Sequence, residues 1–166
     1  MSGLRDQLEP QAQAYAAEKR ILLLRFLGDG NDGAVWESNR ESAVKVLERP
    51  DSYQRERDAY LRLGDRNVTE IEGFAVPALI DHHDTLQVVE MTIVFPPRVL
   101  DFAKSYVDHP PDYPAEALSD WEAEIAEDFG ESKWPTVQSI LGWLRTYGIH
   151  YFDARPGNIR FQEGDE

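Results

Sequence analysis

A closely spaced set of glycines between two short apolar runs constrains the fold of this chain more than any other feature. The set reads Gly28-Asp29-Gly30-Asn31-Asp32-Gly33, with one apolar run before it at residues 21–27 and another after it at residues 34–38. Both runs have the length of strands, so the sequence predicts a glycine-rich hairpin. Glycine suits such a turn because it adopts positive φ and lets the backbone approach a neighbouring group closely. An ordinary turn rich in Gly, Asn and Asp is the alternative interpretation.

A lysine occupies the centre of the next predicted strand, residues 42–47. The sequence there is Ala43-Val44-Lys45-Val46, and side chains alternate along a strand, so the two valines face one side and Lys45 faces the other. An exposed lysine on an edge strand is the alternative. A helix is predicted next, over residues 52–63, because Tyr53, Glu56, Tyr60 and Leu63 recur at helical spacing.

The remaining pattern is that of an α+β protein whose mostly antiparallel sheet comes first. Before the hairpin, residues 3–19 predict a helix with an interruption near Pro10. After the helix at 52–63, residues 76–81 and 86–94 predict a strand pair, and Pro96-Pro97 marks a hinge. The rest is predicted as short or amphipathic elements: helices at 99–107, 120–129 and 135–147, a loop at 109–114, and a strand at 159–161.

The composition limits the partners that this chain can have. It carries 17 Lys and Arg residues against 31 Asp and Glu residues, a formal net charge of −14. This balance argues against nucleic acid and anionic membrane partners, because both require basic surfaces. There is no cysteine, which excludes disulfides and thiolate metal sites. Residues 1–20 lack the apolar core of a secretory signal, and no apolar run reaches the length of a membrane span, so we expect a cytoplasmic protein.

A second motif follows the predicted helix at 135–147. After Gly148 the chain reads His150-Tyr151-Phe152 and then Asp153-Ala154-Arg155-Pro156-Gly157-Asn158. In this order, the glycine hairpin, the strand with Lys45 and the Asp153–Asn158 loop resemble the protein-kinase-like family, in a minimal, bacterial-type form. The resemblance implies an antiparallel β N-lobe with one helix over residues 1–95. It also implies a reduced helical C-lobe over residues 96–166.

The resemblance implies an ATP site. The glycine hairpin covers the phosphates in this family, the strand lysine binds them, and a helix glutamate positions that lysine. Two backbone positions near the hinge contact adenine. Carried onto this sequence, the nucleotide-binding residues are Gly28, Gly30, Gly33, Val35, Lys45, Glu56, Glu90 and Met91.

The resemblance also assigns catalytic roles to the second motif. Asp153 accepts the proton of the attacking hydroxyl, Arg155 neutralises the transferring phosphoryl group, and Asn158 holds Mg²⁺. Lys45, which binds the α and β phosphates, is also counted among the catalytic residues. The acceptor is a protein Ser/Thr or a small-molecule hydroxyl.

One expected part of the family pattern has no counterpart after Asn158. The family carries an Asp-Phe-Gly element there, whose aspartate binds magnesium, followed by an activation segment; here the sequence ends at Glu166. Asp165 or Glu166 is a candidate replacement, and Asp128-Phe129-Gly130 is interpreted as a coincidence because it precedes the loop. The alternatives are therefore a catalytically inactive pseudokinase, acting as a binding or regulatory module, and a piece of a longer enzyme.

Overall fold

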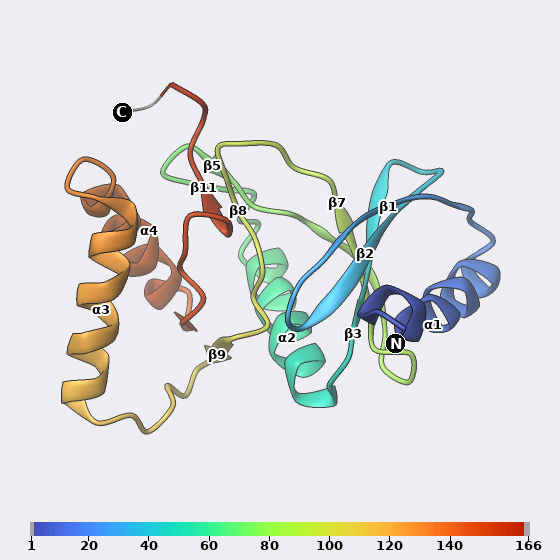
Figure 1. Cartoon of the computed structure of the whole chain (residues 1–166), viewed down its shortest axis with the longest axis horizontal. Coiled ribbons are helices and arrows are strands. Elements are labelled where there is room, and N and C mark those ends of the chain that lie inside the picture. The colour runs from blue at the N-terminus through green and yellow to red at the C-terminus, as the bar shows by residue number, and fades with distance from the viewer. Residues whose placement is uncertain (1, 165–166) are drawn as a thin grey trace.

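A five-stranded antiparallel sheet lies between two helices in the right-hand part of Figure 1. The computed structural model describes residues 2–164. Neighbouring strands follow the order β1-β2-β3-β7-β6, and every pair in this sheet is antiparallel. The strands are β1 (Leu23–Asp29), β2 (Gly33–Ser38), β3 (Ser42–Leu47), β6 (Leu79–His83) and β7 (Val88–Thr92). The glycine set joins β1 to β2, so the predicted hairpin is confirmed.

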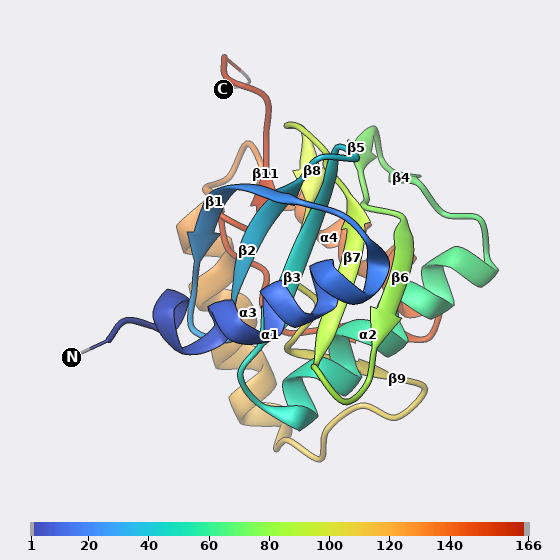
Figure 2. The same cartoon turned by 90° about the vertical axis from the view of Figure 1, so that its right-hand side faces the viewer.

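One helix covers each face of this sheet. Helix α1 (Leu4–Lys19) lies across the strands in Figure 2 and buries its apolar side against β2 and β3. Helix α2 (Pro50–Asp65) lies against the opposite face. The predicted interruption of α1 at Pro10 is wrong, because the helix continues through that residue. Helix α2 begins two residues before its predicted start, with Pro50 in its first turn, where a missing N–H costs nothing.

The predicted helix at residues 99–107 is also wrong. This segment contains two short strands, β8 (Arg98–Val99) and β9 (Ser105–Val107), which pair with β11 (Ile159–Arg160) and β10 (Ile149–Tyr151). Between the two strands, Asp101 has φ 63°, which a right-handed helix does not allow. The apolar spacing that suggested a helix instead places Val99 and Phe102 in the core. Long-range strand pairing therefore decides the conformation of this segment.

The remaining elements complete an α+β protein. Helices α3 (Ala115–Phe129) and α4 (Trp134–Thr146) lie on the side of α2 that faces away from the main sheet (Figure 1). The predicted apolar stripe of α4 is buried. Short strands β4 (Glu70–Ile71) and β5 (Phe74–Ala75) join β8 and β11 in a four-stranded sheet. An antiparallel main sheet and four helices within residues 2–164 confirm the predicted α+β class.

The N-terminal and C-terminal halves share one core. One buried cluster includes Leu47 of β3, Tyr60 of α2 and Ile140 of α4. The four-stranded sheet also crosses the predicted division at residues 95 and 96, because β5 pairs with β8. The division into two lobes stays a prediction. Among the described residues, no helix combines the length and apolar character needed to cross a membrane.

Glu90 anchors α1 to the back of the sheet. Its carboxylate is fully buried and accepts hydrogen bonds from Tyr15 Oη at 2.6 Å, Ser42 Oγ at 2.6 Å and the Arg40 guanidinium. Burial alone would raise the pKa of Glu90, but these donors outweigh it and hold the pKa below its ordinary value. Glu90 therefore has a structural role on the α1 face.

We expect Glu90→Gln to lower the free energy of unfolding by about 2 kcal/mol near neutral pH, because it weakens hydrogen bonds to a buried charge. A carboxyl group with a lowered folded pKa stabilises the protein above its unfolded pKa, and this contribution is lost as pH falls through the folded pKa. Urea unfolding of both proteins should therefore show a difference at pH 7 that shrinks towards pH 3.5. A difference that grew on acidification would contradict this role.

Candidate functional site

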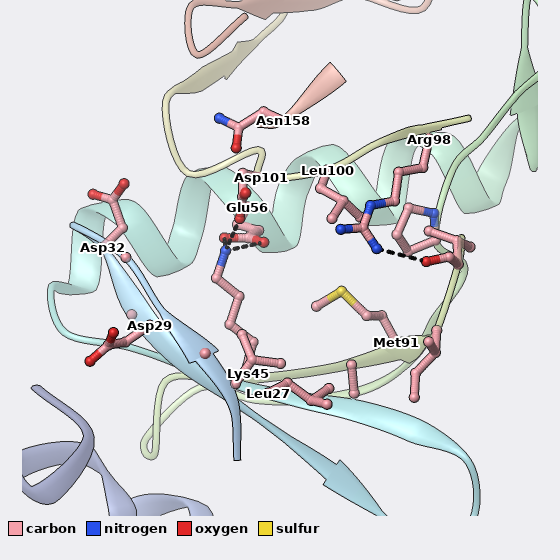
Figure 3. A pocket seen from close by; sticks show the side chains of 18 of the residues that line it. Leu27, Asp29, Asp32, Lys45, Glu56, Met91, Arg98, Leu100, Asp101 and Asn158 are labelled. Atoms are coloured by element: carbon pink, nitrogen blue, oxygen red, sulfur yellow. Dashed lines mark hydrogen bonds and ion pairs between the residues drawn. The ribbon is translucent and has the colours of Figure 1, made fainter. Parts of the chain in front are cut away.

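A cleft of about 570 Å³ lies on the α2 face of the sheet and is bounded by segments that lie far apart in the sequence, between Arg25 and Asn158. The glycine hairpin and β3 form one side, and the segment after β7 forms one end. The loops around Asp101 and Asp153 form the opposite side. Figure 3 shows the side chains of Lys45, Asp101, Arg98 and Asn158 around this space. All the predicted site residues except Glu90 lie in this cleft.

The glycine hairpin fits closely against β3. A Cβ atom at Gly33 would come within 2.2 Å of the Val46 carbonyl oxygen, so only glycine allows this approach. Gly28 has φ 153°, a conformation that side chains rarely adopt. Val35 lies directly across from Lys45 in the β2–β3 register. Asp29 and Asp32 also line the cleft and add negative charge to the hairpin.

Lys45 forms ion pairs with two carboxylates. Its Nζ lies 2.9 Å from Glu56 Oε1 on α2 and 2.8 Å from Asp101 Oδ1. Lys45 and Glu56 are buried, whereas the Asp101 side chain is 41% exposed. The alternation predicted for β3 holds, because Val44 and Val46 pack on the α1 side while Lys45 enters the cleft.

These contacts shift the pKa values of all three groups. Burial lowers the pKa of Lys45, but the attraction of Glu56 and Asp101 outweighs it and raises the net pKa above the ordinary value. The charge of Lys45 is the largest influence on Asp101 and lowers its pKa. Burial raises the pKa of Glu56 to about 7, against the opposing effect of Lys45. Lys45 is thus a fixed cation, and Asp101 is a fixed anion beside it.

The Asp153–Asn158 loop lies across the cleft from Lys45. Asp153 is buried, and its Oδ1 lies 3.0 Å from Arg155 Nε and 3.8 Å from Lys104 Nζ. This oxygen accepts no hydrogen bond of good geometry within residues 2–164. Asn158 donates from Nδ2 to the Asp153 carbonyl at 2.8 Å, which closes the loop. The amide oxygen of Asn158 is turned towards Asp101 in Figure 3.

The strand pairs β8–β11 and β9–β10 bring Asp101 beside this loop. They hold residues 98–107 antiparallel to residues 149–160. Between them, Leu100 N–H donates to the Asn158 carbonyl at 2.8 Å, and Tyr151 Oη donates to the Leu100 carbonyl at 2.5 Å. Asp101 therefore lies beside the Asp153–Asn158 loop in the cleft, although it precedes the loop by about 50 residues in sequence.

Sequence reasoning missed Asp101. Its only local signal is an acidic residue between Leu100 and Phe102, in a segment interpreted as a helix. The other candidates do not replace it: Asp128-Phe129-Gly130 ends α3 and contributes no residue to the cleft. Asp165 and Glu166 lie outside the residues that the structure describes.

At the hinge end of the cleft, the side chains of Glu90 and Met91 lie on different faces of the sheet. Met91 lines the cleft, but Glu90 faces α1 and is absent from the lining. Successive side chains of a strand point to opposite faces, which explains why the Glu90 side chain faces α1. The predicted contact with adenine uses backbone groups, so it stays a prediction. The segment Ile93–Phe95 after β7 and Arg98 complete this end.

Comparisons with known proteins give a partial likeness. No family model matches the sequence, and no curated protein matches it. The ADP-bound crystal structure of aminoglycoside phosphotransferase APH(2'')-Ib matches with a TM-score of 0.41 and 22% identity, over 54% of this chain and 29% of that protein. The streptomycin–ATP ternary complex of APH(2'')-IIa matches with a TM-score of 0.39 and 18% identity, over 77% of this chain and 39% of that protein. The chain thus spans less than half the length of these two structures.

Proposed function

We propose that the cleft binds a purine nucleoside triphosphate, such as ATP, with Mg²⁺ and transfers its terminal phosphate to a hydroxyl group. One observation carries this proposal. The buried Lys45–Glu56 pair faces the Asp153–Asn158 loop across one cleft, under a glycine hairpin. Phosphoryl transfer requires a cation for the phosphates, a flexible glycine cover, and a carboxylate near the acceptor, and this cleft combines all three.

The oxygens of Asp101 and Asn158 fit a magnesium ion. Mg²⁺ prefers carboxylate and carbonyl oxygens, and it is held in such sites by one or two protein groups together with substrate phosphates. The partly exposed carboxylate of Asp101 and the amide oxygen of Asn158 lie on the same side of the cleft (Figure 3). A bound Mg²⁺ would neutralise phosphate charge during transfer.

Asp153 is the proton acceptor in this proposal. An acceptor hydroxyl beside its Oδ1 would give up its proton to the carboxylate as the oxygen bonds to the terminal phosphorus. The bond from that phosphorus to the nucleoside diphosphate breaks at the same time. Arg155 and Lys104 lie near this carboxylate and supply positive charge where negative charge develops. The acceptor is a small-molecule or protein hydroxyl.

Thermal unfolding with nucleotide tests the binding step. At a nucleotide concentration about 100 times Kd, stabilisation of about 2.7 kcal/mol should raise Tm by roughly 5 to 10 °C. We expect ATP with Mg²⁺ to give this rise and ATP alone to give a smaller one. Asp101→Asn should remove the magnesium-dependent part, because the amide lacks the negative charge that attracts the cation.

Asp128→Asn is the matched control, since Asp128 is an acidic residue of α3 that does not line the cleft. It should respond to ATP and Mg²⁺ as the wild type does. If both variants lost the magnesium-dependent rise in Tm equally, Asp101 would not be a ligand of the metal. No rise in Tm for the wild type at millimolar nucleotide would overturn the proposed function itself.

A further inference from the structure

Arg98 places a guanidinium group at the hinge end of the cleft, away from the phosphate-binding end. One of its terminal nitrogens, Nη1, donates to the Val94 carbonyl at 3.1 Å. The Nε is buried and has no hydrogen-bond partner in the described part of the chain. Figure 3 shows Arg98 and Lys45 on different sides of the cavity, with Met91 and Leu100 beside Arg98.

No carboxylate forms an ion pair with Arg98 within residues 2–164; its charged neighbours are Arg160, which repels it, and the more weakly acting Asp101. Burial and the repulsion from Arg160 lower the pKa of Arg98. The charged guanidinium is therefore held at this position at a cost in free energy. A ligand that supplied hydrogen-bond acceptors at this position would offset that cost.

The chemistry of a guanidinium selects the ligand. It carries five N–H donors and no acceptor, in a planar fork that suits two neighbouring acceptors. On the edge formed by O6 and N7, guanine offers two acceptors, whereas adenine offers N7 beside the N6 amino donor. Adenine would therefore place its N6 amino donor against an N–H donor of Arg98 at this end of the cleft.

The space beside Arg98 suits a flat base. Leu27 of β1 lines the cleft from the hairpin side, Leu100 lines it from the opposite side, and Met91 lies between them at the back (Figure 3). One terminal nitrogen of Arg98 is bonded to Val94, and the other is directed towards this space. A base between the two leucines would therefore present its edge to a donor.

We infer that Arg98 makes the cleft selective for a guanine nucleotide over an adenine nucleotide, by donating to O6 and N7 of the base. This inference rests on the proposed binding of a nucleoside triphosphate. A bidentate contact between arginine and guanine discriminates between bases by about 5- to 150-fold in affinity. We expect GTP to bind more tightly than ATP by a factor in that range.

Calorimetric titration with magnesium and three nucleotides tests the inference. The probes are GTP, ATP and ITP, whose hypoxanthine base keeps O6 and N7 but lacks the 2-amino group. GTP and ITP should bind with similar Kd values, and ATP should bind more weakly. Arg98→Met, which keeps the length of the side chain without its donors, should bring GTP and ITP to the affinity of ATP and leave ATP binding within about threefold.

The outcomes separate this inference from the proposed function. If ATP binds at least as tightly as GTP, base selection by Arg98 is overturned while nucleotide binding stands. If Arg98→Met weakens all three nucleotides equally, with an unchanged Tm, Arg98 does not read the base and the inference is also overturned. If none of the three nucleotides binds the wild type, the proposed function fails, and the inference fails with it.

Discussion

Asp153→Asn is expected to reduce phosphate transfer by roughly 10²- to 10⁴-fold, the contribution typical of a positioned general base. Asparagine has nearly the same shape as aspartate but cannot take a proton from the attacking hydroxyl. The substitution leaves Lys45, Glu56 and Asp101 in place, so nucleotide binding should persist. Because water can replace the natural acceptor, the measurement is the basal magnesium-dependent hydrolysis of ATP or GTP to the diphosphate, alongside nucleotide affinity.

Asp120→Asn is the matched control for this experiment. Asp120 is an acidic residue on α3 that does not line the cleft, so its loss should change neither turnover nor binding. Turnover that survives in Asp153→Asn would show that another group accepts the proton. Nucleotide binding by the wild type without any turnover would identify the chain as a pseudokinase, in which the cleft binds nucleotide without transferring phosphate.

The parts of the site that the sequence predicts are those set by local periodicity. Strand alternation places Lys45 on the opposite side from Val44 and Val46, and helical spacing places Glu56 on the buried side of α2. The glycine spacing predicts a hairpin because apolar runs of strand length flank it. Each of these inferences needs only a few consecutive residues, so one sequence is sufficient.

The parts that the sequence does not predict depend on long-range pairing. Asp101 reaches the cleft because residues 98–107 pair with residues 149–160. Nothing in the sequence of either segment predicts which segment it pairs with. Apolar residues in a short segment suit a strand or a buried helix equally well, so the helix prediction at 99–107 was wrong. The structural role of the Glu90 side chain also depends on distant residues, because its hydrogen-bond donors are Tyr15, Arg40 and Ser42.

Lys45→Met is expected to lower the free energy of unfolding by about 3 to 5 kcal/mol and to abolish the nucleotide-dependent rise in Tm. The loss of stability arises because Glu56, which is fully buried, is left without its cation. Methionine fills most of the space of the lysine stem, so the change removes charge more than packing. Lys104→Met is the control for the loss of stability alone, because Lys104 is partly exposed and its ion pair with Asp153 is longer, at 3.8 Å.

The pH dependence of Lys45→Met identifies Glu56 as the cause. Burial already raises the pKa of Glu56 to about 7 in the presence of Lys45, and removing the cation raises it further. A carboxyl group with a raised folded pKa binds more protons folded than unfolded, so stability falls as pH rises from the unfolded pKa to the folded one. The slope is about 1.4 kcal/mol per pH unit. Urea unfolding should therefore show Lys45→Met to be more stable at pH 5.5 than at pH 8.

Adding Glu56→Gln to Lys45→Met should remove this slope and recover much of the lost stability. A double variant as unstable as Lys45→Met at pH 8 would contradict the buried-charge explanation.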